Sequence, residues 1–239
     1  MLAIVTGTIR PSIDVGQLTI RNTKERLEQY IECVQFLIDS EVFSKIIFCE
    51  NSGYGVQAME TLLPVAEKKK IQLELLSFSG NEESIRIHGK GYGEGEIMEY
   101  VFEHSQIVKD EQYFIKITGR LKVANVKAIV SRIREKNTYF NIPNRTLRTL
   151  YDTRIYAMPL EQFKEHFVHR YDEVMDDKGH YLEHVYTKIL KEEDIFVSNF
   201  PRYPRIVGIS GSTGNQYTYT EWKCKIKDII SRLGGYKVK

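Results

Sequence analysis

Two short apolar segments separated by an amphipathic helix constrain the fold of this chain more than any other feature. Residues 2–6 (LAIVT) and 45–49 (KIIFC) are runs of the kind that form fully buried strands. Between them, Asn22 and Glu25 have the spacing of a capping box, and residues 27–38 place apolar side chains on one helical face. The order strand, helix, strand predicts a βαβ unit with a right-handed crossover.

The following segments repeat this alternation. Residues 59–66 predict a second helix that Pro64 bends or shortens, and residues 71–78 predict a third strand. No linker-like composition divides the 239 residues. We therefore expect one α/β domain over residues 1–239, with a mostly parallel central sheet and helices on both faces.

Composition excludes several classes of protein. The apolar share of 42% is that of a folded chain, and a formal net charge of +2 implies no general attraction to nucleic acid. The cysteines at 33, 49 and 224 lack CxxC spacing, which predicts neither a disulfide framework nor a zinc site and fits the cytoplasm. No apolar run approaches the length of a membrane span.

Residues 90–120 are the expected centre of function. The glycines at 91, 93 and 95 predict a turn that passes close to a ligand or another element and lies outside the core, followed by a helix over residues 94–104. A buried strand over residues 113–117 then ends on Thr118, Gly119 and Arg120. Open α/β sheets bind ligands at the carboxyl ends of their strands, so the site is expected there.

The second half of the chain has a looser pattern. Its predicted elements are a helix at 126–133, a loop at 137–148, a strand at 153–158, a helix beginning at Pro159, a helix over 182–189, a strand at 195–197, a flexible loop at 208–214 and a basic terminal helix.

Six short sequences occur in an order that carries a family resemblance: VTGTIRP, ERLEQY, FCENSGYG, KGYGEGE, FIKITGR and HYLEHVY. In this order the chain resembles bacterial GT-A glycosyltransferases that build surface polysaccharides such as O-antigen and capsule. The resemblance covers nearly the whole chain. It implies a Rossmann-like domain in which residues 1–120 bind a nucleotide sugar, residues 121–219 hold the acceptor and catalyse, and residues 220–239 form a basic amphipathic helix.

By position, the resemblance assigns donor binding to Thr6, Gly7, Thr8, Arg10, Glu50, Asn51, Ser52, Lys90, Thr118, Gly119 and Arg120. Residues 50–53 also fit an ordinary turn. The family's Asp-x-Asp metal pair is missing, so a divalent metal has lost its usual ligands, and Arg120 with Lys90 could neutralise the diphosphate instead. A structural ion pair is the alternative for Arg120. Glu94 and Glu96 are interpreted as acids at a helix start rather than as a displaced metal motif.

The resemblance also implies a catalytic base near the start of a late helix. Glu183 fits this position, Asp152 is the second candidate, and Arg154 and His184 are expected to bind the acceptor. Glu183 could equally be a solvated helix residue. The implied partners are a nucleotide sugar, with UDP as the expected nucleotide, and a lipid-linked oligosaccharide at the inner face of the cytoplasmic membrane. No other cofactor is expected.

Two other functions compete with glycosyl transfer. A nucleotidyltransferase uses a similar architecture but needs a glycine- and arginine-rich phosphate loop, and TGTIRP is poor in glycine. A nucleic-acid-binding module is suggested by Arg145, Arg148, Arg154 and the aromatic residues within 139–156, and the low net charge argues against it.

The tail from Thr220 to Lys239 predicts a basic amphipathic helix. Trp222, Ile226, Ile229, Ile230 and Leu233 share one face, and Lys223, Lys225, Lys227, Arg232, Lys237 and Lys239 outnumber the acids. Such a helix suits an anionic membrane surface. The alternative is a terminal helix that packs this apolar face onto its own domain.

Overall fold

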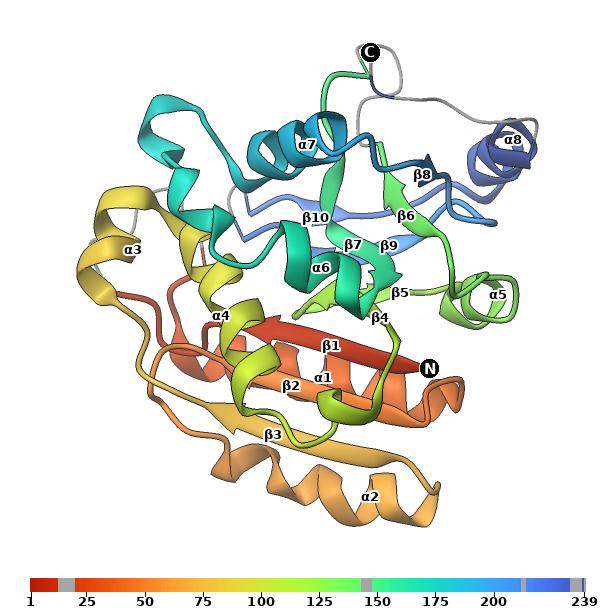
Figure 1. Ribbon diagram of the computed structural model, residues 1–239. Helices are drawn as coiled ribbons and strands as arrows, with labels where there is room; N and C mark the ends of the chain where they lie inside the picture. The colour runs from red at the N-terminus through yellow and green to blue at the C-terminus, as the bar shows by residue number, and fades with distance from the viewer. Residues whose placement is uncertain (13–19, 143–147, 212–213, 233–237, 239) are drawn as a thin grey trace.

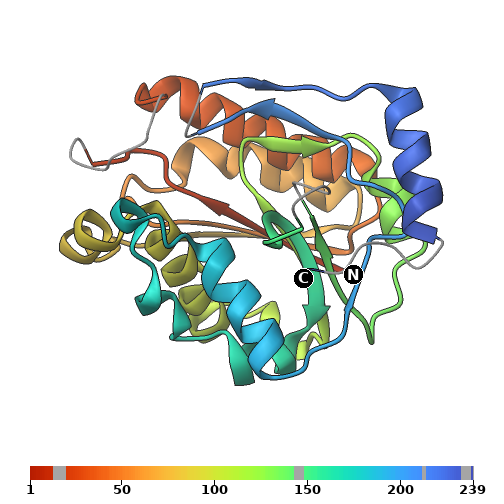
Figure 2. The ribbon, with the colours of Figure 1, turned by 90° about the horizontal axis from the view of Figure 1, so that it is seen from above.

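A mixed β-sheet with helices on both faces is the centre of the computed structural model (Figures 1 and 2). The structure describes residues 1–12, 20–142, 148–211, 214–232 and 238. Within these residues the larger sheet has seven strands in the order β3-β2-β1-β4-β7-β6-β8. They are β1 (Leu2–Gly7), β2 (Lys45–Glu50), β3 (Gln72–Ser77), β4 (Tyr113–Thr118), β6 (Thr138–Asn141), β7 (Asp152–Pro159) and β8 (Val197–Ser198).

The strand directions determine what meets at each edge of the sheet. Strands β3, β2, β1 and β4 are parallel, with Leu2 beside Lys45 on one side and Phe114 on the other. Strand β7 is antiparallel to β4, so Tyr113 pairs with Pro159 and the amino end of β7 lies beside the carboxyl end of β4. The predicted α/β class with a mostly parallel sheet is confirmed.

Helices cover the two faces in separate groups. Helices α1, α2 and α5 pack on the face to which Ala3 and Val5 point, whereas α4, α6 and α7 pack on the face to which Leu2 and Ile4 point. This alternation follows from the period of two along a strand. The helices are α1 (Thr23–Ser40), α2 (Leu63–Lys68), α3 (Glu82–His88), α4 (Lys90–His104), α5 (Val126–Val130), α6 (Leu160–His166), α7 (Leu182–Glu192) and α8 (Glu221–Arg232), with 3-10 turns at Gln57–Leu62, Val108–Asp110, Arg170–Glu173 and Asp176–Lys178.

A smaller antiparallel sheet lies beside α1. It has the order β10-β9-β5 and consists of β5 (Leu121–Val123), β9 (Ile206–Ile209) and β10 (Gln216–Tyr217). The sulfur of Cys33 on α1 lies 3.2 Å from the carbonyl oxygen of Leu121. This sheet also shortens the loop that was predicted over residues 208–214, because Gly208 and Ile209 belong to β9. Its residues 212 and 213 lie outside the described part of the chain.

Several local predictions hold in detail. The side chain of Asn22 accepts from the Glu25 amide at 3.1 Å and begins α1. Pro64 stands at the start of α2, where a 3-10 turn gives way to the α-helix.

The loop predicted over 137–148 is wrong in its first part, because residues 138–141 form β6 by pairing with β7.

The glycine-rich segment is helical, which corrects the predicted turn. Helix α4 begins at Lys90, so Glu94 and Glu96 lie in its second turn rather than at its start. Gly93 and Gly95 are buried, and a Cβ atom on Gly95 would come within 2.2 Å of the Tyr171 Cβ. The close approach predicted for these glycines is correct, but it occurs inside the core.

The segment that suggested nucleic-acid binding does not present its aromatic rings. Tyr139, Phe140 and Tyr151 are buried, so they offer no surface on which bases could stack. Arg145 lies outside the described residues. Among the helices that the structure describes, none has the length and apolar content needed to cross a membrane.

Candidate active site

A cavity of about 660 Å³ opens where β1, β2 and β4 end. The amino ends of α4, α7 and β7 and the loop after β9 complete its walls. This volume is in the range of small-molecule sites, and the position is the one that open α/β sheets use. The predicted residues that line it are Thr6, Gly7, Thr8, Arg10, Asn51, Ser52, Lys90, Thr118, Gly119, Arg120, Asp152, Arg154 and Glu183.

Glu50 is the predicted donor residue that the structure places elsewhere. Its buried carboxylate accepts hydrogen bonds from the amide and hydroxyl of Ser52, the Gly55 amide and the Ser77 hydroxyl. These donors belong to the loop after β2 and to β3, so Glu50 holds that loop in shape. The turn interpretation of residues 50–53 thus fits Glu50, whereas Asn51 and Ser52 line the cavity.

Polar side chains connect the loops after β1 and β2. The Thr8 hydroxyl donates to the Asn51 side chain at 2.7 Å, and the Asn51 amide group donates to the Gly93 carbonyl at 3.2 Å. The backbone amide of Arg10 donates to the Ser52 hydroxyl at 3.0 Å. These contacts preorganise hydrogen-bonding groups along one wall of the cavity.

Two guanidinium groups flank the ring of Tyr30 at this wall. Arg26 is almost fully buried and donates to the carbonyls of Thr8 at 2.8 Å and Ile20 at 3.1 Å. The Arg120 guanidinium lies 5.8 Å from the Tyr30 ring centre and donates to the Gln29 side chain at 3.3 Å. No carboxylate among the described residues pairs with either arginine.

Burial lowers the pKa of Arg26, and the nearby charge of Arg120 lowers it further, while Tyr30 acts in the opposite direction. The structural ion pair considered for Arg120 is not formed with any described residue. A pair of cations that has no acid between them is a favourable place for an anionic ligand.

Sequence reasoning missed Arg26 and Tyr30 as wall residues. Both lie on the buried face of α1, four residues apart, together with Val34 and Leu37. The sequence does contain a signal for Arg26, because its spacing places a charged residue on the apolar face of α1. A buried arginine needs a structural or functional partner.

A fully buried lysine lies behind three residues that line the cavity, Glu94, Thr118 and Thr153. Lys116 of β4 forms an ion pair with Glu94 and donates to the Thr118 hydroxyl at 2.7 Å and to the Thr153 carbonyl at 3.0 Å. Glu94 therefore has a specific partner within the fold. This network ties α4, β4 and β7 together beneath the site.

Glu183 lies in the first turn of α7 and faces the same cavity. Its carboxylate accepts from the Thr153 hydroxyl at 2.9 Å. Burial raises the pKa of Glu183, and the charges of Glu94 and Asp152 raise it further. A carboxylate with few donors and a raised pKa has the properties of a proton acceptor.

Asp152 is held much more tightly. It accepts from the Arg154 backbone amide at 3.0 Å, from the Arg154 guanidinium at 2.9 and 2.6 Å, and from the Asn141 side chain at 3.3 Å. These donors occupy the lone pairs that a catalytic base would need. The Arg154 guanidinium also lies 4.8 Å from the ring centre of Tyr217, a wall residue from β10 that the sequence did not indicate.

His184 is the second predicted site residue that does not line the cavity. Its Nδ1 accepts from the Tyr181 backbone amide at 3.1 Å and so caps the start of α7. Burial and the neighbouring His180 lower its pKa. Asp176, in contrast, lines the cavity although the sequence did not indicate it as a site residue, and burial raises its pKa.

The residues at the usual position of a metal pair do not fit a divalent cation. Thr118, Gly119 and Arg120 end β4, and a Cβ atom at Gly119 would lie 2.6 Å from the Thr6 carbonyl oxygen. A guanidinium is not a metal ligand. Among the residues that the structure describes, no group of three His, Cys, Asp or Glu side chains could hold a metal ion.

The architecture and the cavity define an α/β protein with a large cavity at its strand ends. No family model matches the sequence, and no curated protein matches it. Solved structures with a related outline include the nucleoside-diphosphate-sugar pyrophosphorylase from Vibrio cholerae RC9, at 10% identity and a TM-score of 0.47, with 84% of this chain and 91% of that chain covered.

A second is a Bacillus anthracis protein described as a glucose-1-phosphate thymidylyltransferase, in complex with a sucrose. It is 9% identical, has a TM-score of 0.48, and 97% of this chain and 94% of that chain are covered. Both names denote nucleotidyltransferases rather than glycosyltransferases. The α/β class of the present chain rests on its own strands and helices.

Proposed function

We propose that this chain binds a nucleoside-diphosphate sugar and transfers its sugar to an acceptor hydroxyl. One observation carries the proposal: two arginines that have no acid partner among the described residues, Arg26 and Arg120, share a cavity with Glu183, a carboxylate whose pKa is raised. Arg26 belongs to α1 and Arg120 lies against Tyr30 of α1, whereas Glu183 belongs to α7 on the other face of the sheet. An anionic leaving group and a proton acceptor can therefore occupy opposite sides of one ligand.

The donor fits the wall formed by the carboxyl ends of β1, β2 and β4. Thr8, Asn51 and Ser52 supply hydrogen-bonding groups for a nucleoside, with UDP as the nucleotide that the resemblance implies. Arg120, supported by Arg26, would bind the diphosphate oxygens through charge-assisted hydrogen bonds. The arginines would stabilise the negative charge that develops as the sugar leaves.

Glu183 would act as the general base. The acceptor oxygen attacks the anomeric carbon while the bond from that carbon to the diphosphate oxygen breaks, and the hydroxyl proton passes to Glu183. The nucleoside diphosphate leaves on the arginine side. This single displacement inverts the anomeric configuration. Arg154 and Tyr217 border the space left for an acceptor, for which we propose a lipid-linked oligosaccharide.

Nucleotidyl transfer is the second candidate, and one contact favours it. Arg26 donates to the Thr8 carbonyl, so the loop after β1 has a buried arginine beneath it and Arg10 beside it. The arginine component of a phosphate-binding loop is thus present although its glycines are few. In this reaction a sugar phosphate attacks a nucleoside triphosphate and pyrophosphate leaves.

The leaving groups separate the two candidates experimentally. We expect UDP-sugars, among a panel that includes GDP- and CDP-sugars, to release nucleoside diphosphate, and turnover to survive EDTA. Glu183→Gln should reduce this rate about 10²- to 10⁴-fold with nucleotide binding retained. The matched control is Glu161→Gln, an exposed acid on α6.

Pyrophosphate release from a nucleoside triphosphate and a sugar 1-phosphate would instead assign nucleotidyl transfer. Restoration of an EDTA-inhibited reaction by manganese would contradict the metal-free binding of diphosphate. If no nucleotide raises the melting temperature and neither leaving group appears, both candidates fail.

A further inference from the structure

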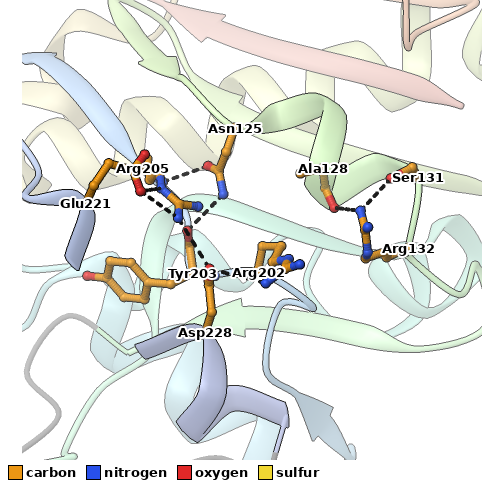
Figure 3. A network of polar contacts seen from close by, with 9 residues as sticks. All are labelled: Asn125, Ala128, Ser131, Arg132, Arg202, Tyr203, Arg205, Glu221 and Asp228. Carbon is orange, nitrogen blue, oxygen red and sulfur yellow. Dashed lines mark hydrogen bonds and ion pairs between the residues drawn. The ribbon is translucent and has the colours of Figure 1, made fainter. Parts of the chain in front are cut away.

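Helix α8 is attached to the domain through its polar face (Figure 3). Asp228 is almost fully buried and accepts from the Tyr203 backbone amide at 2.6 Å. Its other oxygen lies 3.3 Å from the Arg205 guanidinium and 3.5 Å from that of Arg202. Cys224, one turn before Asp228, is also buried. The side of α8 that faces the protein therefore carries a charged residue, Asp228, and a residue with a small side chain, Cys224.

A second acid fixes the rotation of α8 about its axis. Arg205 donates from Nε and one terminal nitrogen to Glu221, at 3.2 and 3.0 Å. Asn125 steadies this segment, because its side chain accepts from the Arg205 amide at 2.9 Å and donates to the Tyr203 carbonyl at 3.0 Å. With Glu221 and Asp228 both bound to one guanidinium, the helix cannot turn its other side inward without breaking these pairs.

The apolar stripe of α8 consequently faces outward. Trp222, Ile226 and Ile229 are 61%, 48% and 56% exposed, and their spacing of four and three places them on one side of the helix. The predicted alternative, in which this face packs onto its own domain, is wrong for these three residues. Leu233, Lys237 and Lys239 of the predicted tail lie outside the described residues. An amphipathic helix usually buries this stripe, so its exposure indicates a partner.

The charges around the stripe are positive. At about 100° per residue, Lys223 lies on one side of the stripe and Lys225 on the other, and both are exposed. The acids Glu221 and Asp228 point to Arg205 and do not offset them. Two further exposed cations lie near the end of the helix. Arg132 and Arg134 line a second cavity of about 340 Å³ together with Ser231 of α8.

We propose that α8 is a binding surface for an anionic lipid bilayer, with Trp222, Ile226 and Ile229 inserted at the headgroup level. Lysines on both sides of an apolar stripe match an apolar layer bordered by phosphate groups. The helix lies at the periphery of the molecule in both views (Figures 1 and 2).

A second copy of the chain fits this surface less well. In a twofold contact the lysines of one α8 would face those of the other. Three side chains on a 12-residue helix also fall short of the roughly 800 Å² per partner that a stable interface buries. A bilayer brings no opposing lysines and does not require a protein interface of this area.

The position of α8 relates the surface to the cavity. Tyr217 lines the cavity and precedes Trp222 by five residues, so their Cα atoms are at most about 18 Å apart. A bilayer bound at α8 would thus lie near the cavity. Lipid binding by α8 does not depend on the reaction.

Trp222 provides a direct readout, because it is the single tryptophan of the chain. We expect its fluorescence in the full chain to shift to shorter wavelength, and brominated lipids to quench it, with phosphatidylcholine vesicles containing phosphatidylglycerol. Pure phosphatidylcholine should have little effect, and added salt should weaken binding. Lys223→Gln with Lys225→Gln should reduce partitioning about 30-fold, and Ile226→Ser with Ile229→Ser should abolish the shift.

The matched control is Ile87→Ser, an exposed apolar residue on α3 that should bind vesicles like the unchanged chain. Thermal melting shows whether each variant is folded. Equal binding to neutral and anionic vesicles, or unchanged binding by the double serine variant, would overturn the proposal. A concentration-dependent shift of Trp222 without lipid, together with a dimer in analytical ultracentrifugation, would assign the surface to a second copy.

Discussion

Helices α1 and α8 are both amphipathic, yet they contact the domain by opposite faces. Helix α1 buries Val34 and Leu37 against the sheet, whereas α8 buries Cys224 and Asp228 and leaves Trp222 in solvent. The difference follows from what each helix meets. The sheet presents an apolar face to α1, and the segment before β9 presents the Arg205 guanidinium and the Tyr203 backbone amide to α8. Amphipathicity defines two faces of a helix, and the partner decides which one is inside.

The largest expected effect comes from removing the acid that anchors α8. Asp228→Ala should lower the free energy of unfolding by about 3–5 kcal/mol, because the buried Arg205 would lose a partner. Urea unfolding followed by circular dichroism measures the change. Asp110→Ala is the control, because this exposed acid lies far from α8 in the sequence and should have little effect. A loss below 1 kcal/mol would show that α8 is held by other contacts.

The apolar stripes of the two helices should respond in opposite ways. Leu37→Ala on α1 should cost about 2–5 kcal/mol, since it leaves a cavity in the core. Ile229→Ala on α8 should change stability by less than about 0.5 kcal/mol, because the side chain is already exposed. Both values come from the same unfolding measurement. Equal losses would mean that Ile229 is buried in solution.

Tyr30, on the buried face of α1, lines the cavity, and Arg120 lies beside its ring. Arg120→Ala should weaken nucleoside diphosphate binding by about 1.5–3 kcal/mol, as expected for a lost charge-assisted hydrogen bond. Isothermal titration calorimetry measures it, with Arg132→Ala on the α5 side as the control. An unchanged affinity in a folded variant removes Arg120 from the site.

The smallest expected change in the free energy of unfolding comes from Glu183, which, unlike Asp228, is an inward-facing acid without a cationic partner among the described residues. Glu183→Gln should raise stability at neutral pH, because burial raises the pKa of Glu183 and thereby disfavours its charged form in the folded protein. Between the pKa values of the unfolded and folded states, the folded protein binds more protons, so stability falls as pH rises through this window.

The gain from Glu183→Gln should therefore vanish in acid and reach its full size above the folded pKa. Urea unfolding at acidic and neutral pH tests this. A gain that is independent of pH would assign the effect to something other than the charge. Removal of the Asp228 carboxylate should instead lower stability, because its charge has partners.

The sequence predicted the elements whose signals are local. The strands at 2–6, 45–49 and 113–117 and the Asn22 cap follow from short apolar runs and capping chemistry, and the structure contains all of them. Strand β6 was missed because its residues read as a loop, and its pairing with β7 depends on residues distant in the chain. Gly95 was misassigned for the same reason, since Tyr171 is far away in the sequence.

The candidate site was predictable to a similar extent. Thr8 and Arg120 stand directly at strand ends, which sequence reasoning identifies. Glu50 also follows this rule, but its carboxylate is occupied by its own loop. Arg26, Asp176 and Tyr217 reach the cavity through a helix face, a turn and a second sheet, and no local pattern marks them as neighbours.

The reversed direction of β7 has a consequence for how such a protein can diverge. Because β7 is antiparallel to β4, the chain leaves the cavity at Thr118 and returns to it at Asp152. The wall formed by residues 152–154 is thus encoded separately from the wall formed by β1, β2 and β4. Mutation or recombination within the later segment can alter the wall at residues 152–154 while the βαβ unit that forms the other wall is inherited unchanged.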